Sequence, residues 1–78
     1  MNNLAYQISR YLESENLDFT REFDKTHGND TLAWGDASKS YEVSIYNSEI
    51  YVYCYLKRQL QSSDTVKDFF EFKKILAR

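Results

Sequence analysis

Two runs of alternating residue types, Tyr41–Tyr46 and Glu49–Lys57, lie next to each other near the middle of the chain. Alternation of aliphatic residues with polar or aromatic residues is typical of β-strands, because successive side chains point to opposite faces of a sheet. The two runs meet at Asn47 and Ser48, and asparagine tolerates the left-handed backbone of a tight turn. The sequence therefore predicts a β-hairpin over residues 41–57.

Counting back from that turn gives the register of the hairpin and divides its side chains between two faces. A slip by one residue would move one arm's aliphatic side chains to the other face, so the pattern favours this register. The expected inner face carries Tyr41, Val43, Ile45, Ile50, Val52, Cys54 and Leu56. The expected outer face pairs Tyr46 with Glu49, Ser44 with Tyr51, Glu42 with Tyr53, and Ser40 with Tyr55.

The outer tyrosines have a structural and a functional interpretation. Aromatic residues favour strands and pair well across them, and another part of the chain could cover them. Tyrosine is also enriched at protein interfaces and their hot spots, which favours a contact surface. Our candidate partner-binding residues are Tyr46, Tyr51, Tyr53, Tyr55, Glu42 and Glu49.

Helical periodicity is found at both ends of the chain. Apolar residues between Leu4 and Leu12 recur on one helical face, and Asn16 suits the left-handed position that ends a helix, so we expect a helix over residues 3–15. A second helix is expected from about Thr65 to Ala77, with Ser63 or Asp64 as its cap. Its apolar arc of roughly 220°, at 100° per residue, indicates either a deeply buried helix or one flank at an interface.

Residues 17–23 and 31–34 have the composition of two further strands. Arg21 interrupts the inner row of the first, which suggests an edge strand or a local tilt. The predicted fold class is α+β, in the order α-β-β-(β)-β-α: an antiparallel meander of three or four strands with the N- and C-terminal helices packed on one face. This arrangement would leave the tyrosine-bearing face open to solvent.

The composition fits one small domain over residues 1–78. With 42% hydrophobic and 17% aromatic residues, the chain can form one compact core. We expect no membrane span, because no apolar run approaches about 18 residues. The start of the chain lacks a basic segment followed by an apolar core, so no signal peptide is expected. A single cysteine favours a reducing, cytoplasmic location.

The chemistry-bearing residues give little support for an enzyme. Cys54 is expected among aliphatic side chains, and no third group would orient a pair with His27. Asp24, His27 and Asp30 lie three residues apart in a polar loop, but their spacing matches no metal motif known to us. The chain has only two glycines and no glycine-rich phosphate loop. We therefore expect no catalytic site, no cofactor and no metal site.

The net charge of −2 is unevenly distributed. Residues 1–50 hold four Lys/Arg and nine Asp/Glu, whereas residues 51–78 hold six Lys/Arg and three Asp/Glu. The interpretations are two ordinary solvated faces, or a dipole that steers a charged partner. Nucleic acid would need cations beside the tyrosines, and carboxylates lie there instead, so direct binding is disfavoured.

Two resemblances bear on function. The order of elements resembles the double-stranded RNA-binding domain in outline, but that module has a lysine cluster where its last helix begins. Here residues 63–68 read Ser-Asp-Thr-Val-Lys-Asp, so this function does not carry over. In size and acidic character the chain is similar to the inhibitors that phages encode against bacterial defences, including anti-CRISPR proteins. In that case the contact could be made by the acidic N-terminal half in place of the tyrosine face, through Glu13, Glu15, Asp18, Glu22 and Asp24.

We therefore expect a small, non-enzymatic protein-binding domain that uses the tyrosine-rich face and its acidic rim. A basic nucleic-acid-processing complex is one partner class, and the chain would then act as its inhibitor. A homodimer through the same face or a strand edge is a variant of this hypothesis. The alternatives are a nucleic-acid-binding module and a structural subunit of a larger assembly.

Overall fold

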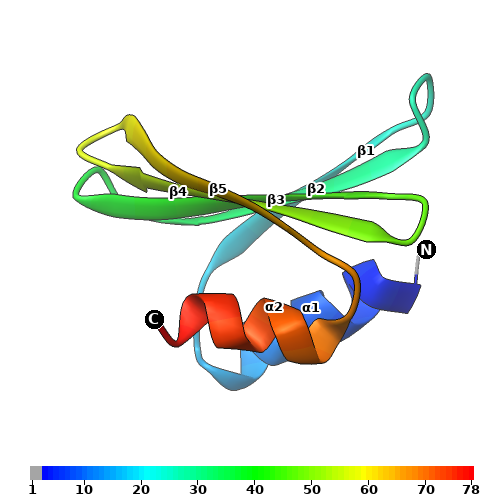
Figure 1. Cartoon of the computed structure of the whole chain (residues 1–78), viewed down its shortest axis with the longest axis horizontal. Coiled ribbons are helices and arrows are strands. Elements are labelled where there is room, and N and C mark those ends of the chain that lie inside the picture. Colours follow the sequence, from blue (N-terminus) through cyan, green and yellow to red (C-terminus); the bar gives the residue numbers. More distant parts are fainter. Residues whose placement is uncertain (1–2) are drawn as a thin grey trace.

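A five-stranded antiparallel sheet lies between two terminal helices in sequence and is covered by both of them on one face (Figure 1). The computed structural model describes residues 3–78, and adjacent strands follow chain order across the sheet. The elements are α1 (Asn3–Ser14), β1 (Phe19–Asp24), β2 (Asn29–Gly35), β3 (Lys39–Tyr46), β4 (Glu49–Leu56), β5 (Gln59–Val66) and α2 (Phe69–Leu76). The α+β fold class predicted from the sequence is confirmed, with five strands instead of three or four.

The central hairpin of β3 and β4 has the predicted register. Val43 pairs with Val52, Tyr46 with Glu49, and Ser44 with Tyr51, as counted from the turn. Asn47 adopts φ 56°, which is the left-handed conformation that a tight turn requires and that asparagine tolerates. Val43, Ile45, Ile50 and Val52 are buried, so the predicted inner face is the one that faces the helices. Leu56, which was also expected on that face, is 42% exposed at the end of β4.

The first helix also agrees with its sequence pattern. Asn16 follows α1 with φ 58° and donates its backbone N–H to the carbonyl oxygen of Glu13 at 3.0 Å. Tyr6 lies off the apolar stripe and is 51% exposed. Helix α1 therefore buries one face, which includes Ala5, Ile8 and Leu12, and leaves Tyr6 in solvent.

The predicted start of the second helix is wrong, and the missing fifth strand is the reason. Residues 59–66 form β5 at the edge of the sheet, and α2 begins only at Phe69. Asp68 caps this helix by accepting the backbone N–H of Glu71 at 2.8 Å, in place of Ser63 or Asp64. Most residues of β5 are exposed and polar, so the strand lacks the apolar alternation that reveals a half-buried strand.

The structure separates the apolar residues that the sequence assigned to one wide arc of the second helix. Val66 belongs to β5, and Phe70 is 63% exposed. Phe72 is fully buried, and its ring makes edge contacts with Tyr11 and Trp34. Helix α2 is therefore anchored by Phe72 and is not buried along its whole apolar arc, whereas an interface at the Phe70 flank stays a prediction.

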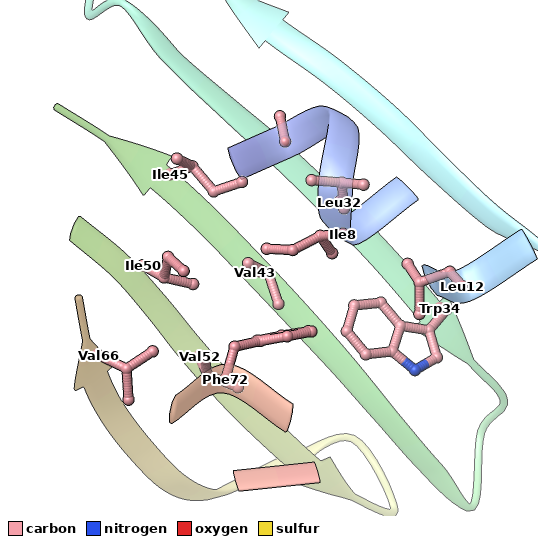
Figure 2. Close-up of a cluster of buried hydrophobic side chains, with 11 residues drawn as sticks. Ile8, Leu12, Leu32, Trp34, Val43, Ile45, Ile50, Val52, Val66 and Phe72 are labelled. Atoms are coloured by element: carbon pink, nitrogen blue, oxygen red, sulfur yellow. The ribbon is translucent and has the colours of Figure 1, made fainter. Parts of the chain in front are cut away.

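The core fills the space between the helices and the inner face of the sheet (Figure 2). Ile8 and Leu12 of α1 lie beside Leu32 and Trp34 of β2, and Phe72 of α2 lies near Val52 of β4. Each of these side chains is at most 7% exposed. Packing of this kind holds the central strands rigidly, which fixes the positions of the alternate side chains on the opposite face.

Strand β1 is an edge strand, as the interruption at Arg21 suggested. The Arg21 side chain lies on the inner side of the sheet, where its Nη2 atom approaches Oδ1 of Asp30 to 2.6 Å. Asp30 is 2% exposed, so this ion pair is largely buried. It fastens β1 to β2 at a place where apolar packing is sparse. Neither of the two described helices is long and apolar enough to span a bilayer.

Candidate protein interface

The strand residues that point away from both helices form what we call the outer face. The pairing registers place alternate residues of each strand on it, opposite the buried aliphatic rows. In Figure 1 no described helix or loop lies across this side of the sheet. Its central residues are Thr31, Ala33, Ser40, Glu42, Ser44, Tyr46, Glu49, Tyr51, Tyr53, Tyr55, Ser63 and Thr65.

Tyr51, Tyr53 and Tyr55 form a row along β4 at the middle of the outer face. Across the sheet, Tyr51 is opposite Ser44 and Thr65, Tyr53 is opposite Glu42 and Ser63, and Tyr55 is opposite Ser40 and Leu60. The three tyrosines are half-buried, and Tyr46 at the end of β3 is 46% exposed. Four of these six neighbours are short, so the row presents part of its aromatic surface to solvent.

The charge on the outer face is of one sign. Its strand positions carry the carboxylates of Glu22, Asp24, Glu42 and Glu49, and no lysine or arginine. The nearest cations in the sequence belong to the loops at the ends of the sheet, at Lys25 and at residues 57–58. The acidic rim predicted from Glu42 and Glu49 thus extends to β1.

A shallow hollow of about 430 Å³ opens on the outer face, beside the β1–β2 turn and near the ends of β3 and β4 that the turn at Asn47 and Ser48 joins. Tyr46, Tyr51 and Tyr53 line one side of it. Residues of the β1–β2 hairpin, Asp24, His27 and Asn29, line the other side, together with Ser44 of β3. We call this space the tyrosine hollow.

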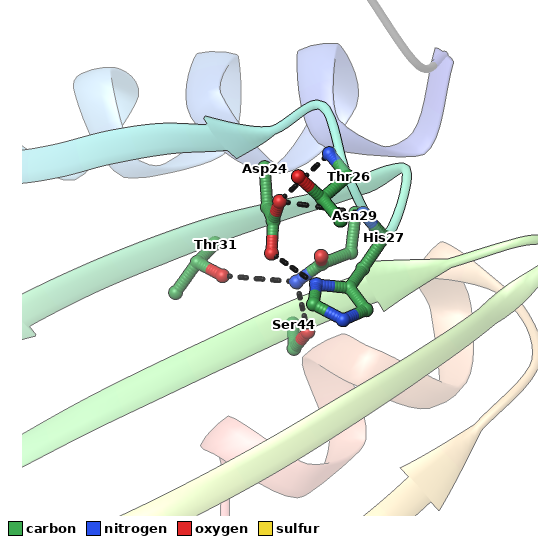
Figure 3. Close-up of polar contacts among 6 residues, drawn as sticks. All are labelled: Asp24, Thr26, His27, Asn29, Thr31 and Ser44. Carbon is green, nitrogen blue, oxygen red and sulfur yellow. Dashed lines mark hydrogen bonds and ion pairs between the residues drawn. The ribbon is translucent and has the colours of Figure 1, made fainter.

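The polar wall of the tyrosine hollow is held by hydrogen bonds within the β1–β2 turn (Figure 3). Oδ1 of Asp24 accepts the backbone N–H groups of Thr26 at 2.9 Å and His27 at 3.3 Å, and its Oδ2 lies 2.6 Å from Nδ1 of His27. The Asn29 amide donates to Oγ1 of Thr31 at 3.4 Å and to Oγ of Ser44 at 3.2 Å. These bonds orient the wall without help from a ligand.

Two pKa values on this face are displaced. The His27 side chain, followed by the backbone N–H groups of His27 and Thr26, holds the pKa of Asp24 below its usual range. The negative charge of Glu49, with partial desolvation and a hydrogen bond from the tyrosine hydroxyl to Glu49, raises the pKa of Tyr51. Asp24 is therefore a carboxylate, and Tyr51 a neutral phenol, throughout the physiological range.

The candidate residues chosen from the sequence lie on one face but in two places. Tyr46, Tyr51 and Tyr53 line the tyrosine hollow, with Glu49 bonded to Tyr51. Tyr55 and Glu42 instead line a second, smaller hollow of about 250 Å³ toward the opposite end of the strands.

The sequence pointed to Asp24 and His27 only as part of a metal trio, and the structure separates that trio. Asp30 points to the inner side and pairs with Arg21, whereas Asp24 and His27 remain together on the exposed turn. The described residues contain no group of three potential metal ligands. Cys54 lies opposite Tyr41 on the inner side, away from the turn that carries His27.

Asn29 and Ser44 are the residues of the tyrosine hollow that sequence reasoning missed. Asn29 was assigned to a loop, but it begins β2 and pairs with Asp24. Extending the strand back to that pair would have placed both side chains on the outer face. Comparisons of this chain with protein-family models, with curated proteins and with solved structures found no match.

Proposed function

We propose that this chain is a non-enzymatic protein-binding domain whose outer face engages a basic surface of a partner protein. The observation that carries the proposal is the uncovered tyrosine row flanked by carboxylates, with no lysine or arginine among the strand positions of that face. Rigid tyrosine side chains supply large contact areas at low entropic cost, and each adds a hydroxyl for hydrogen bonding.

The rigidity of the face supports this function. Val52 and Ile50 alternate with Tyr51 and Tyr53 along β4, and both aliphatic side chains are at most 1% exposed. The tyrosine backbone is therefore fixed by the core on the other side of the sheet. A preorganised surface loses less entropy on association, which leaves more of the contact energy as affinity.

The charge of the face supports a basic partner. Carboxylates around aromatic contacts favour a positively charged protein surface and disfavour phosphate groups. An extended basic patch is the electrostatic footprint of a protein that binds nucleic acid. A protein of a nucleic-acid-processing complex is accordingly the partner class we propose, with inhibition by occupying its basic groove as the consequence.

The first test is capture of a partner from a nuclease-treated lysate of the native cells, with the tagged chain as bait. The informative variant is Tyr51→Thr/Tyr53→Thr, because threonine keeps the preference for strands while it removes both rings. Tyr6→Thr is the control, since it removes an exposed tyrosine ring from α1, on the other side of the sheet. We expect retention of one protein by the wild type and the control, and its loss with the double variant.

A second pair of variants tests the charge. Glu42→Gln/Glu49→Gln should weaken binding of the captured protein about two- to thirtyfold, because exposed ion pairs contribute about 0.2–1 kcal/mol each. Glu13→Gln/Glu15→Gln changes the net charge equally on the helical side and should have little effect. Binding that survives loss of Tyr51 and Tyr53 in a folded protein contradicts the proposal, and so does capture that requires intact nucleic acid.

A further inference from the structure

We infer that the tyrosine hollow is a receptor for one arginine side chain of the partner. The inference rests on the proposed function and deepens it, because it names the chemical group that the outer face selects. The hollow combines aromatic rings from β3 and β4 with a preoriented acceptor wall from the β1–β2 turn. Both components are of a kind that attracts a cation.

The aromatic side supplies faces on which a guanidinium group can stack. Tyr51 and Tyr53 are successive outer residues of β4, and Tyr46 is diagonal to Tyr51 across the β3–β4 pair. All three line the same space. Guanidinium groups stack on aromatic rings, which combines cation–π attraction with flat contact.

The polar side offers hydrogen-bond acceptors. Asp24 keeps its negative charge, and its position is fixed by bonds from the Thr26 and His27 backbone. Because a carboxylate only accepts, the 2.6 Å contact to His27 places the proton of a neutral imidazole on Nδ1 and leaves the Nε2 lone pair available. The Asn29 amide nitrogen is engaged with Thr31 and Ser44, which leaves its carbonyl oxygen as an acceptor.

The distribution of these acceptors favours arginine over lysine. They are spread over the end of β1, the turn and the start of β2, at Asp24, His27 and Asn29. The planar guanidinium carries five N–H donors in a fixed fork, whereas the ammonium of lysine is a compact point charge. The Asp24 carboxylate already accepts three hydrogen bonds, so it would attract a guanidinium mainly through its negative charge and could accept about one more hydrogen bond.

The test is an NMR titration of the folded chain at pH 8 with the acetylated, amidated peptide Gly-Gly-Arg-Gly-Gly. Two further peptides are titrated at the same salt concentration. The peptide with lysine at the central position keeps the charge and changes the shape, and the peptide with citrulline keeps the shape and removes the charge. We expect a Kd of about 10–100 mM for the arginine peptide, as one exposed side chain can provide. Shift changes should map to the rings of Tyr51, Tyr53 and His27 and to the Asn29 amide.

The variants have matched controls within the chain. Asp24→Asn removes the negative charge but keeps a carbonyl oxygen that can accept the backbone N–H groups of the turn. Asp36→Asn is its control, because Asp36 accepts the N–H groups of Ser38 and Lys39 in a turn outside the hollow. Tyr53→Thr removes a lining ring, and Tyr55→Thr removes a ring of the same strand that lines the other hollow. We expect at least threefold weaker arginine binding for Asp24→Asn and Tyr53→Thr, and unchanged binding for both controls.

The outcomes separate this inference from the proposed function. Binding at least threefold weaker for the lysine peptide, with little response to citrulline, supports an arginine receptor. Equal responses to arginine and lysine, shifts that map elsewhere, or insensitivity to Asp24→Asn overturn it. In those cases the proposed function still stands if partner capture depends on Tyr51 and Tyr53, and it falls separately if capture does not.

Discussion

The ion pair between Arg21 and Asp30 is predicted to hold the β1–β2 hairpin, and with it the polar wall of the tyrosine hollow. Asp30 lies between Asn29 and Thr31 on β2, whose side chains point to the outer face. Arg21 lies on an edge strand where Phe23, another inner residue, is 56% exposed. The informative perturbations are Arg21→Met, which keeps an unbranched apolar stem, Asp30→Leu, and the double variant.

The expected costs are unequal because the two side chains are buried to different degrees. Arg21→Met leaves the Asp30 carboxylate, which is 2% exposed, without its ion-pair partner, and we expect the free energy of unfolding to fall by about 2–4 kcal/mol. Asp30→Leu frees a guanidinium that is already 28% exposed and can extend into water, so its cost is about 1 kcal/mol. Arg21 Nε is buried without a hydrogen-bond partner among residues 3–78, so removing both charges should return stability to within about 1 kcal/mol of wild type.

Chemical denaturation of the four proteins measures these differences and the coupling between them. The total stability of a 78-residue chain is about 4–12 kcal/mol, so the Arg21→Met loss is easily resolved. Hydrogen exchange should show the loss first in β1. Equal costs for the two single changes, or a double variant as unstable as Arg21→Met, would refute the argument that the buried carboxylate is the expensive partner.

Two further predictions concern the turns. Lys57 and Arg58 form the two-residue turn between β4 and β5, and both adopt positive φ, at 50° and 66°. Because glycine adopts positive φ without strain, Arg58→Gly should stabilise the fold by about 1 kcal/mol and raise Tm by about 4–8 °C in calorimetry. Unchanged or lower stability would contradict the strain argument. His27→Ala should raise the pKa of Asp24 toward its ordinary value while that of Asp36 stays low, as followed by carboxyl NMR. Because the folded pKa of Asp24 is lowered, its stabilising contribution is present at neutral pH and is lost as pH falls through that pKa. If the pKa of Asp24 does not change in His27→Ala, the backbone hydrogen bonds alone lower it, and the prediction is wrong.

The β3–β4 hairpin could be read from the sequence because every local signal in it agrees. Val43, Ile45, Ile50 and Val52 form one aliphatic row, and only one register buries all of them. The outer positions of the tyrosines follow from that register without any further information. Helix α1 was predictable for the same reason, since Ile8 and Leu12 mark a single buried stripe.

Strand β5 and the tyrosine hollow could not be predicted, for two different physical reasons. Residues 59–65 are largely exposed at a sheet edge, so backbone pairing with β4 decides their conformation and their side chains carry no strand signal. The predicted meander has the observed strand order, but the hollow also depends on residues 24–29, which close the β1–β2 hairpin beside Tyr51. These residues are polar and have no periodic pattern, so the sequence predicts a loop there and gives their side chains no face of the sheet.

The same features that shape the outer face also argue for a partner of a different kind from the chain itself. A symmetric dimer through this face would bring the carboxylates of Glu42 and Glu49 from both copies together, with no strand lysine or arginine to offset them. The edges of the sheet oppose self-pairing as well. Arg21 is an inward-pointing charge on β1, and the register shift opposite Cys54 and Tyr55 interrupts the ladder of β5. A different protein with a basic surface can contact the tyrosine rings and also neutralise the carboxylates, whereas a second copy of this chain can only contact the tyrosine rings.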